Sequence, residues 1–390
     1  MSLAIALAAA LAWAVLLLGR GGFWRCDVDD RDAASLPEPA RWPSVAVVVP
    51  ARDEAETIGA TVAGLLAQDY PGPFRIVLVD DRSRDGTAEA AQAVADGNPR
   101  LEIVRGAPRP AGWTGKLWAL RQGLGHLAGG APADYLLFTD ADIRHAPDSL
   151  RRLVARAETS GAVLVSLMAR LRCESLAERA LIPAFVFFFQ MLYPFRWANA
   201  PKDRARTAAA AGGCVLLRRA AFERAGGLEP IRGEIIDDCS LARQMKAQGP
   251  IWIGLTDRVI SLRGYQGLDG IRRMVARTAY AQLGYNPLAL VGMLLALALV
   301  FLAPPALAQA GSDSAARAIG AATWLAMAGA FVPMLRRYGL SPAWGLALPG
   351  IAATYMLFTL DSAWQEARGR GGMWKGEPGP RADPSRAGGA

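Results

Sequence analysis

Four short apolar runs, separated by helical patterns, constrain the fold of this 390-residue chain. The runs are rich in Val, Ile and Leu, as expected of strands buried on both faces of a sheet. They cover residues 45–49, 76–79, 101–104 and 135–138, and the helical patterns between them cover 53–68, 87–96 and 116–127. Asp53 and Glu56 have the spacing of a capping box at the first helix start. This alternation predicts an α/β fold with a mainly parallel sheet flanked by helices.

Acidic residues follow two of these strands. Ligands of such sheets bind outside the carboxyl ends of the strands, where Asp80 and Asp81 and then Asp140 and Asp142 are expected. Side chains one residue apart in a strand share a face, so the last two carboxylates leave their strand side by side. Two such charges repel unless a cation lies between them, and a hard divalent cation takes carboxylate ligands. The pattern indicates a metal that bridges a diphosphate; the alternative is a solvated turn.

Apolar segments account for much of the 52% hydrophobic content. They cover residues 3–18, 287–308, 318–335 and 343–360, each near membrane-spanning length. No basic region precedes the first segment and no cleavage site fits before Arg20, so we expect an uncleaved anchor. Arg20 and Arg25 behind the first segment, and Arg336 and Arg337 behind the third, place the middle of the chain in the cytoplasm. The basic tail also favours the cytoplasmic side of the membrane. Four complete spans would place that tail on the other side, unless one C-terminal segment is re-entrant or interfacial.

Charge and cysteine content exclude several classes of protein. The net charge is +8, but no compact Lys/Arg run with interleaved aromatics indicates a nucleic-acid partner. Anionic headgroups and a nucleotide diphosphate are the expected counterparts. The cysteines show no Cys-x-x-Cys spacing, so no zinc site or disulfide framework is expected, and they suit a reducing cytoplasm: Cys26, Cys173, Cys214 and Cys239. Only two histidines are present, which argues against a His-based metal site or triad.

The predicted organisation has five parts. They are an anchor at 1–26, a linker at 27–43, a catalytic domain at 44–285, transmembrane segments at 286–361 and a polar tail at 362–390. Within the domain, residues 181–195 are very apolar but short for a span. Two interpretations stay open for them: a buried core helix, or an interfacial segment that admits a lipid.

Residues 44–280 resemble inverting family 2 glycosyltransferases with a GT-A domain, and more narrowly the membrane-bound hopene-associated glycosyltransferases of bacteria. The similarity lies in Val-Ala-Val-Val-Val-Pro-Ala-Arg-Asp-Glu at 45–54, Val-Asp-Asp-Arg-Ser-Arg-Asp-Gly-Thr at 79–87 and Thr-Asp-Ala-Asp at 139–142. It extends to Gly-Lys-Leu-Trp-Ala-Leu at 115–120, Ala-Gly-Gly-Cys at 211–214 and Ile-Ile-Asp-Asp at 235–238.

The resemblance implies a set of donor-binding residues. Pro50, Ala51 and Arg52 are expected near the nucleotide base, Glu54 near the ribose or base, and Asp81 with Asp80 at the uracil or ribose. Asp140 and Asp142 are expected to hold Mg²⁺ or Mn²⁺ and the diphosphate. For Lys116 two interpretations remain, a cation beside the diphosphate and a surface lysine. For Asp85-Gly86-Thr87 an ordinary turn and helix start is preferred.

The resemblance also implies an acceptor side. Gly212 and Gly213 form the loop that lets backbone approach a ligand, and Asp238 is the catalytic base, with Asp237 beside it. Helix capping is the alternative for either acid. Many membrane-bound relatives carry Gln-x-x-Arg-Trp after the base; here Arg273 and Arg277 are the candidates to neutralise diphosphate. The missing tryptophan favours a single transfer, and residues 373–376 resemble a basic-aromatic element of some relatives.

The sequence therefore predicts a multi-pass inner-membrane enzyme with a cytoplasmic catalytic domain. It would move a sugar from a nucleotide sugar, expected to be a UDP-sugar, to a lipid acceptor by metal-assisted direct displacement, with a hopanoid-related acceptor suggested by the resemblance. The alternatives are a polyprenyl-phosphate glycosyltransferase, a polysaccharide synthase, and a membrane scaffold that retains the fold without activity.

Overall fold

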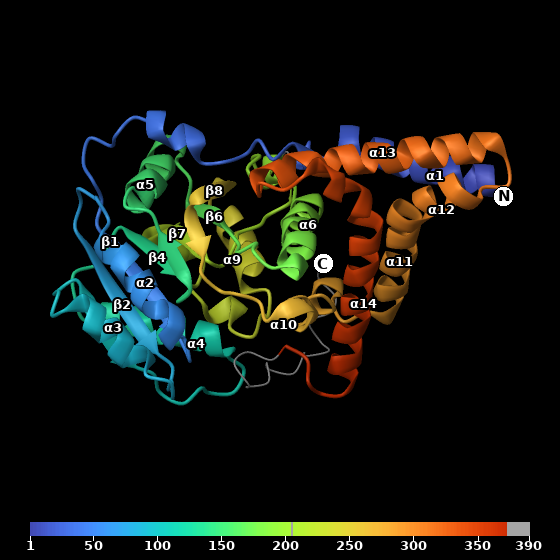
Figure 1. The fold of residues 1–390 in the computed structure, drawn as a ribbon. Coiled ribbons are helices and arrows are strands. Elements are labelled where there is room, and N and C mark those ends of the chain that lie inside the picture. Colours follow the sequence, from blue (N-terminus) through green and yellow to red (C-terminus); the bar gives the residue numbers. More distant parts are fainter. Residues whose placement is uncertain (204–205, 373–390) are drawn as a thin grey trace.

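A sheet and a group of apolar helices make up the two parts of the computed structural model, which describes residues 1–203 and 206–372 (Figure 1). Within these residues the sheet has eight strands in the order β3-β2-β1-β4-β7-β6-β8-β5. The strands are β1 Val45–Ala51, β2 Phe74–Asp80, β3 Leu101–Arg105, β4 Tyr135–Thr139, β5 Ile143–His145, β6 Leu164–Arg170, β7 Cys214–Arg218 and β8 Ile251–Ser261. All four predicted strands are present.

The sheet is mixed rather than wholly parallel. β1 pairs in parallel with β2 and β4, and β2 pairs in parallel with β3, as the alternating pattern predicted. β7 then runs antiparallel to both β4 and β6, while β6 and β8 are parallel. Every residue of β1 is buried, because helices cover both faces of the sheet.

Helices on the two faces of the sheet make two separate apolar clusters. One face packs against α2 Ala55–Leu66, α3 Thr87–Ala95 and α5 Ser149–Ser160. The other packs against α4 Gly115–Leu127, α8 Arg219–Arg224 and α9 Asp237–Lys246. The first turns of α4 and α9 therefore lie on the same side of the sheet, which matters for the site below.

The predicted capping box at the start of α2 is wrong. Glu54 is the N-cap and its side chain makes no capping hydrogen bond. The backbone N–H groups there are satisfied by the loop after β2 instead: Glu54 N–H donates to Thr87 Oγ1 at 2.9 Å and Ala55 N–H donates to Asp85 Oδ2 at 2.9 Å. Asp85 and Thr87 thus have the structural role predicted for their turn, and they also tie the ends of β1 and β2 together.

Four apolar segments are long and apolar enough to cross a membrane, among the residues that the structure describes: Ser2–Gly19, Pro287–Ala310, Ser314–Arg337 and Pro342–Ala367. They contain α1 Ser2–Ala14, α11 Pro287–Leu297, α12 Ala303–Ala310, α13 Ser314–Arg337 and α14 Leu348–Ala367. In Figure 1, α13 lies along α1 and α12, whereas α11 and α14 run across them. A π-helical turn at Ala298–Leu302 separates α11 from α12.

Three shorter helices join the sheet to the apolar part: α6 Leu176–Leu192, α7 Phe195–Ala198 and α10 Gly267–Ala276. One face of α6 is buried in a cluster with α13 and α14, where the rings of Phe187 and Phe331 lie 5.1 Å apart. α10 packs on both α6 and α14. The apolar stretch 181–195 therefore forms the packing layer between the domain and the apolar helices.

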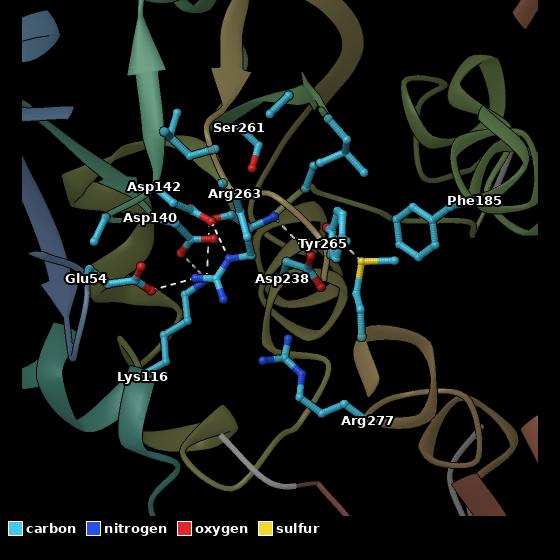
Figure 2. Close-up of a pocket in the computed structure, with 18 of the residues that line it drawn as sticks. Glu54, Lys116, Asp140, Asp142, Phe185, Asp238, Ser261, Arg263, Tyr265 and Arg277 are labelled. Carbon is cyan, nitrogen blue, oxygen red and sulfur yellow. Dashed lines mark hydrogen bonds and ion pairs between the residues drawn. The ribbon is translucent and has the colours of Figure 1, made fainter. Parts of the chain in front are cut away.

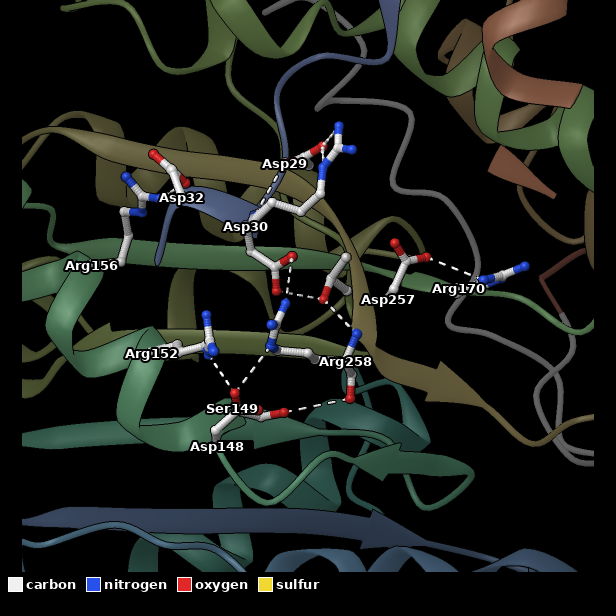
Figure 3. Close-up of polar contacts among 12 residues, drawn as sticks. Asp29, Asp30, Asp32, Asp148, Ser149, Arg152, Arg156, Arg170, Asp257 and Arg258 are labelled. Atoms are coloured by element: carbon white, nitrogen blue, oxygen red, sulfur yellow. Dashed lines mark hydrogen bonds and ion pairs between the residues drawn. The ribbon is translucent and has the colours of Figure 1, made fainter. Parts of the chain in front are cut away.

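The segment after α1 is attached to the domain along β8 (Figure 3). Leu255 N–H donates to Val28 O at 2.9 Å, and Asp30 N–H donates to Leu255 O at 3.0 Å. The buried Asp30 carboxylate accepts from Thr256 Oγ1 at 2.6 Å. Asp257 of the same strand pairs with Arg337 at the end of α13 at 3.3 Å. The predicted linker thus attaches the chain after α1 to β8, and Arg337 attaches the end of α13 to the same strand.

Candidate functional site

The carboxyl ends of β1 and β4 bring the first acidic residues together. Asp140 and Asp142 follow β4, and Glu54 follows β1; all three line one cavity of about 600 Å³. Thr139 Oγ1 donates to Gly213 O at 2.8 Å and lies 2.8 Å from the His145 ring, which fixes the start of the turn. Burial lowers the pKa of His145 to about 4, so this ring is neutral and structural.

Lys116 connects the turn after β4 with the first turn of α9, and Figure 2 shows it on the Asp140 side. It lies in the first turn of α4, and its Nζ is 2.7 Å from Asp140 Oδ1 and 3.7 Å from Asp237 Oδ2. Burial alone would lower the pKa of Lys116, but the carboxylates of Asp140 and Asp237 outweigh it and raise that pKa. Lys116 is therefore a charged residue inside the site and not a surface lysine.

Asp238 lies in the first turn of α9 and faces the same cavity. Its Oδ2 accepts from Gly212 N–H at 3.0 Å and its Oδ1 accepts from its neighbour Cys239 N–H at 2.7 Å. Burial, and then the charge of Asp237, raise the pKa of Asp238 to about 6. A carboxylate with that pKa can take up a proton near neutral pH, as a general base must.

Arg263 is a site residue that the sequence analysis missed. It follows β8, and its Nε is 2.6 Å from Asp142 Oδ2 while its Nη2 is 2.5 Å from Glu54 Oε1. Figure 2 shows it between these carboxylates. The only sequence signal was a basic residue behind an apolar strand-like run, and the strand at 251–261 was not predicted.

The cavity gathers most of the predicted site residues. Those that line it are Pro50, Arg52, Glu54, Lys116, Asp140, Asp142, Gly212, Gly213, Asp238, Arg273 and Arg277. Four others do not: Ala51 is buried in β1, Asp80 accepts from Ser83 N–H at 3.0 Å, Asp81 pairs with Arg52 at 3.4 Å, and Asp237 lines a neighbouring cavity. Residues 373–376 lie outside the described residues.

The donor set fits a hard divalent cation that shares its ligands with a substrate. In residues 1–203 and 206–372, no group of three or more His, Cys, Asp or Glu side chains is arranged to hold a metal ion. Asp140 and Asp142 supply two carboxylates at one cavity wall, and Mg²⁺ is commonly held by one or two carboxylates together with substrate phosphates. The side chains of Lys116 and Arg263 pair with these two carboxylates in this structure.

Comparisons with known proteins identify a family of glycosyl transferases. Residues 46–226 match the model of glycosyl transferase family 2. An N-acetylglucosaminyltransferase of Mesorhizobium japonicum is 29% identical over 48% of this chain and 42% of its own. A beta-monoglucosyldiacylglycerol synthase of Synechocystis sp. is 34% identical over 32% of this chain and 24% of its own. An N-acetylglucosaminyltransferase of Bradyrhizobium elkanii is 30% identical over 34% of this chain and 71% of its own.

One solved structure is similar over nearly the whole chain. It is a mannosyltransferase of Pyrobaculum calidifontis in complex with GDP-mannose and Mn²⁺, with a TM-score of 0.56, 23% identity and coverage of 94% of this chain and 100% of that one. At this identity the likeness concerns the fold, which is GT-A-like as predicted. The chain spans less than half the length of the first two curated relatives. The family model is matched across β1, β2 and β4, and the relative from Bradyrhizobium elkanii is covered over most of its length, so this chain belongs to glycosyltransferase family 2.

Proposed function

We propose that this protein transfers a sugar from a nucleotide sugar to a hydroxyl group of a membrane lipid, with inversion at the anomeric carbon. The observation that carries the proposal is the position of Lys116, whose Nζ reaches both the Asp140 carboxylate and the Asp237 carboxylate. The diphosphate motif and the base motif, nearly a hundred residues apart in sequence, therefore share one cation and one cavity.

Asp238 has the position of the general base. Its carboxylate would take the proton of the acceptor hydroxyl while the acceptor oxygen bonds to the anomeric carbon. The bond from that carbon to the diphosphate oxygen breaks in the same step, and the nucleoside diphosphate leaves. A positioned base of this kind typically contributes about 10²–10⁴ in rate. One displacement inverts the configuration, so no second carboxylate is needed as a nucleophile.

Negative charge develops on the leaving diphosphate, and several basic side chains of the cavity could neutralise that charge. Asp140 and Asp142 would hold Mg²⁺ or Mn²⁺, which stabilises that charge electrostatically when bound. Lys116 and Arg263 lie beside these carboxylates, and Arg273 and Arg277 line the cavity nearer α10. Pro50, Arg52 and Glu54 lie at the end of β1, where the nucleoside is expected.

Three features support a lipid acceptor at the inner membrane. The cavity lies beside α6 and α10, which pack against the candidate spans. One relative is named for the synthesis of a glycosylated diacylglycerol. Arg20 follows the first candidate span, and Arg336 and Arg337 end the third. By the positive-inside rule these three arginines favour a cytoplasmic position for the catalytic domain. A hopanoid-related acceptor and a UDP-sugar donor complete the proposal.

The test uses the full chain in lipid nanodiscs with a panel of labelled UDP- and GDP-sugars and Mn²⁺. We expect release of one nucleoside diphosphate per sugar found in extracted lipid, and the inverted anomer by NMR. Asp238→Asn should abolish transfer and keep donor binding. Lipid mass spectrometry of cells with and without the gene identifies the acceptor: a glycosylated polyprenyl phosphate or a polymer would replace the proposal by that activity, and no transfer with any donor would support a scaffold.

A further inference from the structure

A second cavity, of about 340 Å³, opens from the catalytic base toward the candidate spans. Five residues line both cavities, so the two are adjacent: Phe185, Phe189, Asp238, Met274 and Arg277. Figure 2 shows Asp238, Arg277 and Phe185 around this junction. We call the second cavity the acceptor groove; its walls come from α6, α9, α10, α11, α14 and the segment 277–283.

The acceptor groove is apolar beyond the junction. Phe188, Leu192, Met293, Leu297 and Ala352 form much of its wall. Three of the four hydroxyl groups in its described lining are already satisfied inside the protein. Tyr355 Oη donates to Leu181 O at 2.8 Å, Thr359 Oγ1 donates to Tyr355 O at 2.9 Å, and Tyr193 Oη donates to Gln282 Oε1 at 2.9 Å. The groove therefore suits an occupant that is apolar along its length.

Charge is confined to the catalytic end of the groove. The charged residues among its described lining are Asp237, Asp238 and Arg277, which together carry a net negative charge when ionised. A terminal phosphate at this end would face two carboxylates with one arginine in the lining, and the nearby Lys116 ammonium is already shared between Asp140 and Asp237. A neutral hydroxyl would meet a carboxylate that can accept its hydrogen bond. Charge complementarity thus favours an alcohol over a lipid phosphate.

The other end of the groove lies between two candidate spans. Met293 and Leu297 come from α11, and Ala352 and Tyr355 come from α14. The outer face of α11 is apolar and exposed, with Leu288 81% and Leu295 67% exposed, as expected of a surface that faces lipid chains. An apolar molecule that entered from a bilayer between α11 and α14 would therefore meet apolar side chains of both helices.

We propose that the acceptor groove seats the apolar body of an uncharged lipid alcohol, with its hydroxyl at Asp238 and its far end in the bilayer between α11 and α14. This inference rests on the proposed sugar transfer and names the acceptor class. The groove is at the small end of the range for ligand sites, which is about 300–1,000 Å³, so a long lipid is held in part and the remainder stays in the bilayer.

The probe is hexadecanol with a diazirine in its chain, photolysed with the full protein in phosphatidylcholine nanodiscs; hexadecyl phosphate with the same diazirine is the charged comparison. We expect the alcohol to label peptides of α6, α11 and α14 that line the groove. Ala352→Phe, which fills the groove, should lower this labelling and sugar transfer by about tenfold or more. Ala353→Phe, the neighbouring residue outside the lining, is the matched control and should keep both.

A second pair of variants distinguishes a blocked groove from a folding defect. Met293→Trp narrows the outer end of the groove at a half-buried position, and Leu295→Trp adds the same side chain on the exposed face of α11. Only Met293→Trp should lose labelling by the alcohol probe, and this variant should retain metal-dependent nucleotide binding. The inference would be overturned if the two variants of each pair were labelled equally by the alcohol probe. It would also be overturned if the phosphate probe labelled the groove as strongly as the alcohol probe does.

The experiments give different results if the acceptor-groove proposal is wrong and if the proposed function is wrong. Groove variants that transfer sugar at the wild-type rate would refute the acceptor groove while sugar transfer stands. Specific labelling of the groove in a protein that transfers no sugar from any donor would refute the proposed function and leave a lipid-alcohol site.

Discussion

The pH dependence of transfer tests the role of Asp238 most directly. The base must be ionised to accept the hydroxyl proton, and burial together with Asp237 raises its pKa to about 6. Because the pKa of this acid is raised, activity should be lost at a higher pH than for an ordinary aspartate. Below the pKa the ionised fraction falls about tenfold per pH unit, so the rate at pH 5 should be about one-tenth of that at pH 7.

Two neighbouring charges should move this midpoint in opposite directions. The Asp237 carboxylate raises the pKa of Asp238, whereas the Lys116 ammonium lowers it. Asp237→Asn should therefore shift the midpoint to lower pH, and Lys116→Gln should shift it to higher pH. Each shift should be about one pH unit, the lower end of what a charge close to a buried carboxyl produces.

The assay is single-turnover formation of glycosylated lipid at saturating donor and Mn²⁺, from about pH 5 to about pH 8, where a base of this pKa titrates. Donor binding is measured at each pH, so that loss of nucleotide affinity in Lys116→Gln is separated from loss of chemistry. A flat profile, or shifts of the same sign in the two variants, would refute the assignment of Asp238 as the base.

Three further predictions concern neighbouring parts of the structure. Asp142→Asn should weaken Mn²⁺-dependent nucleotide binding about tenfold or more while metal-free binding changes little, as titration calorimetry would show; unchanged dependence on Mn²⁺ would contradict the metal role. Arg263→Gln should destabilise the free protein by about 1–2 kcal/mol, because it leaves the buried Asp142 without its counter-charge, and thermal unfolding in detergent measures this. Asp30→Ala should cost about 1–2 kcal/mol in the same assay because Thr256 Oγ1 loses its buried acceptor, and an unchanged melting temperature would show that the linker attachment adds no stability.

The strands and the acidic motifs were predictable because their signals are local. A run such as residues 45–49 has no polar face, so it can only be a strand or helix buried on all sides, and its length and β-branched content favour the strand. Once the strands are parallel, their carboxyl ends meet at one edge. Asp140 and Asp142 were therefore expected at the same edge as Asp80 and Asp81. The structure places Asp140 and Asp142 in the cavity, whereas Asp80 and Asp81 do not line it.

Contacts between distant segments were not predictable from such patterns. Arg263 meets Glu54 across 209 positions of sequence, and nothing around Arg263 marks it as different from other arginines. The same holds for the start of α2, where Asp85 replaces the expected local cap. The acceptor groove is also built from single residues on several helices, each of which has the apolar pattern of an ordinary packed helix.

The first turn of α9 explains why a sugar would pass to a lipid and not to water. On one side Asp238 meets the polar groups of Gly212 and Lys116, and on the other its neighbours Ile236 and Cys239 belong to the acceptor groove. The apolar surroundings that raise the pKa of Asp238 are thus partly the walls that would seat the acceptor. An alcohol in the groove would displace water from the base, so hydrolysis of the donor should fall as transfer begins. The ratio of hydrolysis to transfer should accordingly rise in Ala352→Phe and stay unchanged in Ala353→Phe.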